Sequence, residues 1–268
     1  MAAPEAARKA DSWGWLGVPG RILEQVLVFV GECSILLWES VKRLFAPPYE
    51  AAETFNQMAF IGVASVPIVA LTTFSSGAVI ALYSADILVQ YGATMLAGGA
   101  VALAVTREIA PVLAGIMVAA RAGSAMAAQI GTMAVTEQVD ALRSLNVHPV
   151  KYLVIPRLIA CATMLPVLGL VGIYAGVTGG YLVSIYGSRV PHGAFMQSVQ
   201  QFSQISDIGY ALVKTIVFGI IVAIVACQQG LRTRDGAVGV GRATTQTVVI
   251  TMVLIYVANF VLTWLMFK

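Results

Sequence analysis

The first hydrophobic pattern along the chain is that of a helix with a charged stripe. On a helical wheel of residues 22–48, the polar side chains fall within an arc of roughly 100°, which only Val28 and Ile35 interrupt. These polar residues are Arg21, Glu24, Gln25, Glu32, Glu39, Lys42 and Arg43. A membrane-spanning helix would not carry charges along its whole length. We therefore expect this segment to lie in the membrane interface and to end at Pro47 and Pro48.

Five long apolar runs follow this segment. They cover residues 54–88, 93–131, 153–185, 209–229 and 244–267. As one helix, the 35 residues of the first run would be about 52 Å long, whereas the hydrocarbon core of a bilayer is about 30 Å thick. We expect this run to tilt, protrude or break, with the break in the Thr, Ser and Gly cluster at residues 72–77.

The composition excludes a soluble domain. Hydrophobic residues make up 59% of the 268 residues and charged ones 11%, whereas soluble domains carry about 25% charged residues. The mean hydropathy is +0.85. We predict an all-α integral membrane protein with an N-terminal interfacial helix, five transmembrane helices and a short cytoplasmic helix. Its parts are a tail at residues 1–21, the interfacial helix at 22–48 and a membrane domain at 49–268. No cleavable signal peptide is expected, because no continuous apolar run precedes Arg21.

The basic residues predict the orientation. Cytoplasmic loops of membrane proteins carry an excess of Lys and Arg. One set of connections contains Lys42, Arg43, Arg143, Lys151, Arg157, Arg232, Arg234 and Arg242. The opposite set contains Arg189, and Lys268 ends the chain. We expect the N-terminus to be cytoplasmic and the C-terminus to lie on the outer side, as five spans require.

Three charged residues stand inside the second apolar run: Arg107, Glu108 and Arg121. Ionisable side chains at membrane depth are costly and tend to face a cavity or another charge. Pro111 cannot donate a hydrogen bond to the carbonyl of Arg107, so we expect a kink there. A kink beside a carboxylate favours a functional site, and a structural ion pair is the alternative.

The loop after the second run contains a short amphipathic helix. We expect Thr136 to cap it, Glu137 and Asp140 to occupy its first turn, and Asn146 and Pro149 to end it after about ten residues. Such a helix is either a docking element for a cytoplasmic partner or an ordinary connection. Residues 191–208 predict a second amphipathic helix on the outer surface, which we expect to rest among lipid head groups. Gly172, Gly176 and Gly180 predict close helix packing, within the chain or between subunits.

Two stretches resemble a known family. Residues 106–160 read TREIAPVLAGIMVAARAGSAMAAQIGTMAVTEQVDALRSLNVHPVKYLVIPRLIA, and the chain ends with GRATTQTVV at 241–249 and NFVLTWLMFK at 259–268. These stretches are similar to the MlaE/YrbE permeases in order and spacing, and the resemblance covers residues 50–268. In this chain Ala110 stands where a common family form has glycine before the proline.

The resemblance implies a permease subunit of an MCE-type ABC transporter that moves phospholipids between the inner and outer membranes. It further implies a homodimer in the inner membrane, an ATP-binding ABC subunit docked below each copy, and a periplasmic ring of MCE-domain proteins. A small STAS-domain protein often accompanies the ATPase. ATP and Mg would be bound by the partner subunit, because no GxxxxGK[ST] motif is present. No cofactor of its own, no metal site and no nucleic acid are expected.

The resemblance also implies roles for individual residues. Substrate binding would involve Glu108 and Arg107, with Ile80, Leu88 and Tyr91 along the outer part of the lipid path. Contact with the ATPase would involve the coupling helix and a later loop, namely Thr136, Glu137, Asp140, Leu142, Arg143, Leu145, Arg232 and Arg234.

Two other classes of function were weighed. An ion-coupled secondary transporter of amphipathic substrates would require an inverted repeat and several acidic residues in the spans, whereas Glu108 is the chief one here. An intramembrane enzyme would need a base near Ser124, yet no histidine lies in a predicted span. His148 and His192 are predicted on opposite sides of the membrane, which excludes a catalytic pair.

Overall fold

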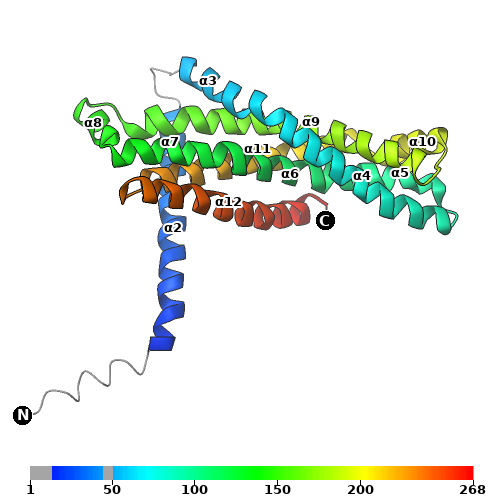
Figure 1. Cartoon of the computed structure of the whole chain (residues 1–268), viewed down its shortest axis with the longest axis horizontal. Helices are drawn as coiled ribbons and strands as arrows, with labels where there is room; N and C mark the ends of the chain where they lie inside the picture. Colours follow the sequence, from blue (N-terminus) through cyan, green and yellow to red (C-terminus); the bar gives the residue numbers. More distant parts are fainter. Residues whose placement is uncertain (1–13, 45–50, 268) are drawn as a thin grey trace, which may run out of the picture.

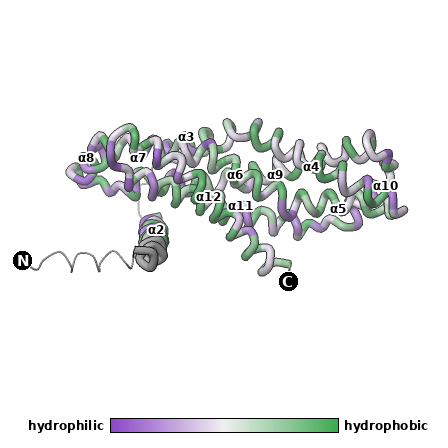
Figure 2. Tube along the Cα trace, turned by 60° about the horizontal axis from the view of Figure 1, so that its bottom comes forward, coloured by the Kyte–Doolittle hydropathy of each residue, from purple (hydrophilic) through white to green (hydrophobic). Residues whose placement is uncertain are grey.

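The computed structural model describes residues 14–44 and 51–267, which form helices and turns without a β-strand. Five of these stretches are long and apolar enough to cross a membrane: Ala51–Gln90, Thr94–Val135, Val150–Tyr186, Ile205–Leu231 and Gly236–Phe267. They run side by side in an elongated bundle (Figure 1). Hydrophilic residues gather toward the two ends of the bundle and on α2 (Figure 2). The predicted all-α integral membrane protein with five spans is confirmed.

The helices are named here in chain order. They are α2 (Gly14–Leu44), α3 (Ala51–Ile61), η2 (Val63–Ser65), α4 (Val66–Gln90), η3 (Thr94–Leu96), α5 (Ala97–Ala104), η4 (Val105–Ile109), α6 (Ala110–Val118), η5 (Ala119–Gly123), α7 (Ser124–Val135), α8 (Gln138–Ser144), η6 (Val150–Val154), α9 (Ile155–Tyr186), α10 (His192–Phe202), α11 (Ile205–Leu231) and α12 (Gly236–Phe267).

Helix α2 crosses the bundle instead of joining it. Both views show it running across the long axis of the other helices, near the end that carries α8 (Figures 1 and 2). Its Glu32 accepts a hydrogen bond from Gln228 at 2.6 Å, near the end of α11. Phe29 and Leu37 face apolar residues of α11, among them Ile224. This crosswise direction supports the predicted interfacial position, which remains a prediction. Pro47 and Pro48 lie outside the described residues.

The first span is interrupted, but not where the sequence suggested. A short 3-10 turn, η2, interrupts the α-helix just before Pro67. The α-helix then continues without a break from Val66 to Gln90. The predicted break at residues 72–77 is wrong, because the threonines there bond within the helix. Thr73, for example, donates to the carbonyl of Val69 at 2.7 Å. Gly77 serves close packing instead: a Cβ there would overlap the carbonyl oxygen of Gly176 in α9.

The small residues of α9 pack against the first and second spans of the same chain. Gly180 lies against Val101 of the second span and the carbonyl of Gly77 of the first, and Gly172 lies against Thr73. Because these contacts are intramolecular, the repeated glycines of α9 are explained by packing of the third span against the first two.

The second span is one helical stretch of 42 residues with two wide turns. The π-helical turns η4 and η5 interrupt the α-helix at Val105–Ile109 and Ala119–Gly123. The irregularity expected at Pro111 thus takes the form of a π-turn immediately before the proline, a feature often found at functional sites. At about 1.5 Å per residue, the stretch is about 60 Å long, so it extends beyond a bilayer core of about 30 Å.

The short helices α8 and α10 lie at opposite ends of the bundle (Figure 1). The helix predicted at residues 191–208 ends at Phe202, and α11 begins at Ile205. Helix α10 is fixed to the bundle rather than resting on its surface alone: Phe195 is buried, and Ser198 accepts a hydrogen bond from the backbone N–H of Gly99 at 2.8 Å. Arg157, expected in a loop, lies buried within α9.

Candidate functional site

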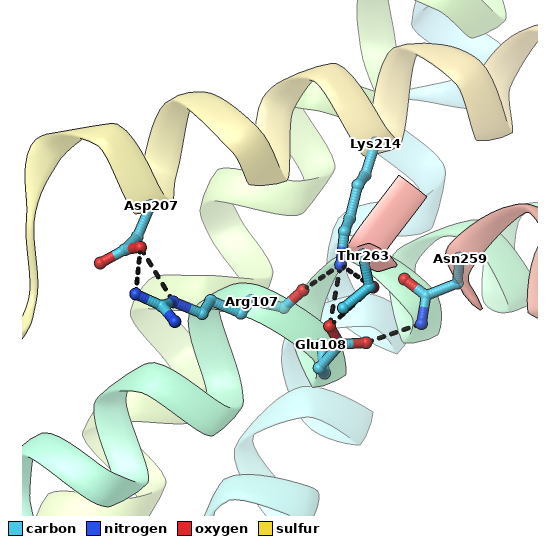
Figure 3. Close-up of polar contacts among 6 residues, drawn as sticks. All are labelled: Arg107, Glu108, Asp207, Lys214, Asn259 and Thr263. Atoms are coloured by element: carbon cyan, nitrogen blue, oxygen red, sulfur yellow. Dashed lines mark hydrogen bonds and ion pairs between the residues drawn. The ribbon is translucent and has the colours of Figure 1, made fainter. Parts of the chain in front are cut away.

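Two oppositely charged pairs connect the second and fourth spans (Figure 3). Arg107 and Glu108 are neighbours in the π-helical turn η4, whereas Asp207 and Lys214 come from α11. An Arg107 nitrogen lies 2.8 Å from Asp207 Oδ1, and Lys214 Nζ lies 2.9 Å from Glu108 Oε1. Each charge therefore has a partner of opposite sign, as ionisable groups at membrane depth require.

The ammonium group of Lys214 is completely buried and fully hydrogen-bonded. It donates to the carbonyl of Arg107 at 2.7 Å, to Glu108 Oε1 at 2.9 Å and to Thr263 Oγ1 at 2.8 Å. An ammonium has three donors, and all three are used. The carbonyl of Arg107 would normally accept from the residue four positions later, which is Pro111 and has no N–H. Lys214 thus replaces the bond that the proline removes.

Glu108 joins three spans through its carboxylate. Thr263 donates to Oε1 at 2.9 Å, beside the bond from Lys214, and Asn259 donates to Oε2 at 2.6 Å. Thr263 and Asn259 both belong to α12. The Glu108 side chain is 41% exposed, whereas that of Lys214 is 0% exposed. Glu108 is therefore the accessible member of the pair, and Lys214 is the counter-charge behind it.

Arg107 points away from Glu108. Its Nε and one terminal nitrogen both contact Asp207 Oδ1, and its guanidinium lies 4.5 Å from the ring of Phe267. Asp207 is buried, and its other carboxylate oxygen accepts from the backbone N–H of Gln204, which begins α11. This pair fixes the start of the fourth span against the second.

A groove opens beside Glu108. It has a volume of about 550 Å³ and is lined by Ser75, Ser76, Val79, Ile80, Glu108, Ile109, Val112, Leu113, Tyr256 and Asn259. We call this the Glu108 groove. Its walls come from α4, from η4 with α6, and from α12. Apolar side chains form most of its surface, and Glu108 is its single charged residue. The arrangement can accept an elongated apolar molecule that carries a polar group at one place.

The structure brings together two of the five predicted substrate-binding residues. Ile80 and Glu108 line the same groove. Leu88 packs instead near Ala85 and Phe195, Tyr91 is 83% exposed at the end of α4, and Arg107 is held by Asp207. These three lie outside the Glu108 groove, so their part in substrate binding remains a prediction without support from this cavity.

Four residues of this site were not predicted from the sequence: Asp207, Lys214, Asn259 and Thr263. One signal was present: Asp207 and Lys214 stand seven positions apart, on one face of a helix, with charges opposite to those of Arg107 and Glu108. Charges of opposite sign in two apolar runs predict mutual neutralisation. Asn259 and Thr263 gave no such signal, because single polar uncharged residues are common in apolar helices.

Arg121 has a structural position. It donates to the carbonyl of Phe60 at 3.0 Å and to the hydroxyl of Ser65 at 3.1 Å. These two residues lie at the 3-10 turn η2 that interrupts the first span. It does not line the Glu108 groove. The alternative of a structural ion pair describes Arg107, which is paired with Asp207. Glu108 also forms an ion pair, with Lys214, but in addition it lines a groove as a functional residue would.

A second, polar pocket lies at the α8 end of the bundle. It has a volume of about 740 Å³ and contains three of the predicted coupling residues, Asp140, Arg143 and Arg234. We call it the α8 pocket. Arg232 lies in a neighbouring pocket, 3.5 Å from Glu32 of α2. The two segments predicted to be cytoplasmic and to act together are therefore close in space.

The short helix differs from its prediction in its length, its cap and the position of Glu137. Helix α8 has seven residues, Gln138–Ser144, and Thr136 does not cap it. The Thr136 hydroxyl donates to the carbonyl of Thr132 in α7, and Glu137 takes a left-handed conformation with φ of 60° to turn the chain. Most of α8 is exposed, but its apolar residues Val139 and Leu142 are buried and half-buried. Leu145, which directly follows the helix, is 73% exposed.

The two histidines lie far apart, as predicted. His148 Nε2 is 3.2 Å from Glu39 Oε1 at the α8 end, and His192 Nδ1 is 2.9 Å from the Tyr181 hydroxyl at the α10 end. Helices α8 and α10 mark opposite ends of the bundle (Figure 1). The histidines thus form no catalytic pair.

Comparison with known proteins identifies the family. The family model "Permease MlaE" matches residues 54–265. A probable ABC transporter permease protein of Rickettsia typhi is 44% identical over 239 residues, which cover 89% of this chain and 92% of that protein. A probable ABC transporter permease protein of Synechocystis sp. is 45% identical over 215 residues, or 80% of this chain and 82% of that protein.

A plant protein is similar as well. The chloroplastic protein trigalactosyldiacylglycerol 1 of Arabidopsis thaliana is 36% identical over 236 residues, which cover 87% of this chain and 67% of that protein. Together with the five spans, these similarities show that the chain belongs to the MlaE permease family and is the multi-pass permease subunit of an ABC transporter.

Proposed function

We propose that this permease moves phospholipids between the inner and outer membranes, with energy from ATP hydrolysed by a separate subunit. The observation that carries the proposal is the Glu108 groove, which combines mostly apolar walls with one charged residue. Its volume of about 550 Å³ is within the range of ligand pockets, about 300–1,000 Å³. The name of the Arabidopsis relative, which is that of a galactolipid, agrees with a lipid substrate.

The groove matches the two parts of a lipid. Val79, Ile80, Val112 and Leu113 provide apolar contacts for an acyl chain, and Glu108 marks the place of the head group. A water-soluble substrate would gain little from these walls, because burial of apolar surface is favourable only for an apolar ligand. This division of the groove favours an amphipathic substrate.

The energy source is proposed to act at the α8 end. The sequence contains no GxxxxGK[ST] motif, so ATP and Mg would be bound by an ABC subunit that contacts α8 and the segment containing Arg232 and Arg234. The exposed Leu145 and the exposed pair Asp140–Arg143 give α8 an apolar and a charged contact for that partner.

The rest of the assembly follows from the resemblance to the family. We propose a homodimer in the inner membrane, with an MCE-domain ring on the outer side and a STAS-domain protein beside the ATPase. The N-terminus would be cytoplasmic and the C-terminus periplasmic. The last span fits such an assembly, because its residues Tyr256, Phe260 and Trp264 are all more than half exposed.

The ion-coupled alternative has less support. A carboxylate that carries a proton or a sodium ion must be free to release its counter-charge, whereas Glu108 accepts bonds from Lys214, Asn259 and Thr263 at once. Family membership likewise favours an ATP-driven system.

Reconstitution tests the proposal. The permease and its ATPase subunit are placed in vesicles with labelled phospholipid, and transfer to acceptor vesicles is measured with and without ATP. We expect transfer that needs both ATP and the ATPase, and a loss of transfer in Glu108→Ala. ATP-independent transfer driven by an ion gradient would support the rival class. Normal binding and transfer in Glu108→Ala would remove the role assigned to Glu108.

Co-purification tests the coupling contact. Reversing the charges of α8 with Glu137→Lys and Asp140→Lys should weaken association with the ATPase subunit. Asp86→Lys is the matched control, because Asp86 is an exposed acid on α4 that lies outside both pockets. Unchanged co-purification of the α8 variant would contradict the assignment.

A further inference from the structure

We propose that the Glu108 groove selects its lipid by head-group charge, an inference that rests on the proposed lipid transport. It favours lipids whose head group carries an ammonium, such as phosphatidylethanolamine, over lipids with a net negative head group, such as phosphatidylglycerol. The reason is the sign of the charge that the groove presents.

The groove presents one negative charge and no positive one. Of its lining residues, Glu108 alone is charged, and its side chain is 41% exposed. Both nearby cations are unavailable to a ligand in the groove: Lys214 is 0% exposed, and Arg107 is bound to Asp207. A head group beside Glu108 therefore meets the carboxylate, whereas the counter-charge lies behind it.

Lys214 cannot turn to an anionic head group without losing its present bonds. Its three donors are used by Arg107, Glu108 and Thr263, at 2.7 Å, 2.9 Å and 2.8 Å. A lipid phosphate would have to break one of these bonds and approach the Glu108 carboxylate at the same time. An ammonium needs no such rearrangement, because a carboxylate oxygen can accept more than one hydrogen bond.

The uncharged polar residues of the groove fit a zwitterionic head group. Ser75 and Ser76 on α4 and Tyr256 on α12 supply hydroxyl groups that can donate to a phosphate. Asn259 is held by its amide nitrogen on Glu108, and its side-chain oxygen is buried, so it adds no acceptor to this wall. The groove thus offers the Glu108 carboxylate for the ammonium, and hydroxyl donors for the phosphate.

The expected preference is about tenfold. A hydrogen bond to a charged group contributes more than a neutral one and, at the size usual for such bonds, changes affinity by roughly one order of magnitude. The apolar walls lower the local dielectric, which strengthens the attraction of the carboxylate for an ammonium and its repulsion of an anion.

The test compares two lipids with identical acyl chains. Vesicles contain the permease, its ATPase subunit and equal amounts of labelled phosphatidylethanolamine and phosphatidylglycerol. Two quantities are measured: the ATP-dependent transfer of each lipid, and the amount of each that stays on the permease after purification in detergent. We expect phosphatidylethanolamine to exceed phosphatidylglycerol about tenfold in both.

Charge variants make the inference sharper. Glu108→Gln leaves Lys214 as the uncompensated charge at the groove, so the preference should reverse toward phosphatidylglycerol. The double variant Glu108→Gln with Lys214→Met has neither charge, and we expect it to retain both lipids equally. Asp86→Asn, which removes an exposed carboxylate from α4 outside the groove, is the control and should keep the original preference.

The outcomes separate this inference from the proposed function. Equal transfer and equal retention of the two lipids by the unchanged protein would overturn the charge selection while leaving lipid transport intact. A preference that survives in Glu108→Gln would also overturn it. If neither lipid is transferred or retained, the proposed function itself fails. If Glu108→Gln does not fold, the double variant still decides, because a retained preference there would contradict the role of the carboxylate.

Discussion

Replacing Lys214 with methionine should destabilise the bundle more than any exposed charge change. The substitution keeps an unbranched side chain of similar length but removes all three donors of a group that is 0% exposed. The carbonyl of Arg107 and one oxygen each of Glu108 and Thr263 then lose a hydrogen bond. Removing one partner of a buried pair costs about 3–5 kcal/mol. Because the Glu108 side chain is 41% exposed, we expect the lower end, about 3 kcal/mol.

A double-mutant cycle isolates the pair itself. Lys214→Met and Glu108→Gln are measured singly and together, as the free energy of unfolding in mixed micelles of increasing dodecyl sulfate content. The double variant contains no unpaired charge, so its loss should fall short of the sum of the single losses by about 2 kcal/mol.

The exposed pair Asp140–Arg143 provides the control cycle. Its 2.8 Å separation is close to the 2.9 Å between Lys214 and Glu108, but its side chains are 67% and 65% exposed. Its coupling should stay below about 1 kcal/mol. Equal coupling in the two cycles would refute the reasoning, since it would mean that burial adds nothing to the pair.

Two other substitutions follow from packing and from burial. Gly77→Ala should lower the free energy of unfolding by more than about 2 kcal/mol, because the added Cβ would overlap the carbonyl of Gly176. Gly241→Ala is its control in the same assay and should be neutral or stabilising, because nothing lies within 4 Å of the added atom. Burial and the adjacent Glu32 raise the pKa of Cys33 to about 11 from 9.0, so it should react with maleimide at pH 8 about a hundredfold more slowly than an ordinary thiol. With the two buried cysteines replaced, Ser34→Cys on the exposed neighbour provides the reference, and equal labelling rates would contradict the shift.

The sequence predicted the spans well because span length is a local property. A run of apolar residues long enough to cross a bilayer must be helical, since lipid offers no partner for an unpaired backbone group. Most ends of the observed spans lie within four residues of the predicted ones, for instance Val150–Tyr186 against 153–185, whereas the last span begins eight residues earlier than predicted, at Gly236 instead of 244. The charged stripe of α2 is a local pattern too, and it predicted a helix there, although the helix begins at Gly14 rather than at residue 22.

The candidate site could be predicted only in part, because its contacts join residues that are far apart in the sequence. Glu108 is visible in sequence as a charge beside a proline. Its partners Lys214, Asn259 and Thr263 stand 106, 151 and 155 positions away, and only the packing of α11 and α12 against η4 brings them together. Apart from the charge of Lys214, which is opposite to that of Glu108, the sequence contains no trace of these contacts.

Packing also explains why the break in the first span was misplaced. A cluster of Thr, Ser and Gly weakens an isolated helix, but in α4 the threonines bond to preceding carbonyls and Gly77 admits α9 to close contact. The first span is interrupted instead by the 3-10 turn η2, just before Pro67. Arg121 of the second span donates to the carbonyl of Phe60 near this turn, so a side chain from another helix stabilises the interruption.

Stability alone does not account for the pair of Lys214 and Glu108. Two well-packed apolar residues of similar volume are often as stable as a buried ion pair, because the desolvation of the charges offsets their attraction. What an apolar pair could not supply is a carboxylate at the wall of the groove. An isolated carboxylate beside that apolar surface would be costly to desolvate, and a buried ammonium with three satisfied donors offsets this cost. Lys214 therefore acts as the positioning residue that holds Glu108 charged and fixed, and the groove gains one defined polar point for its ligand.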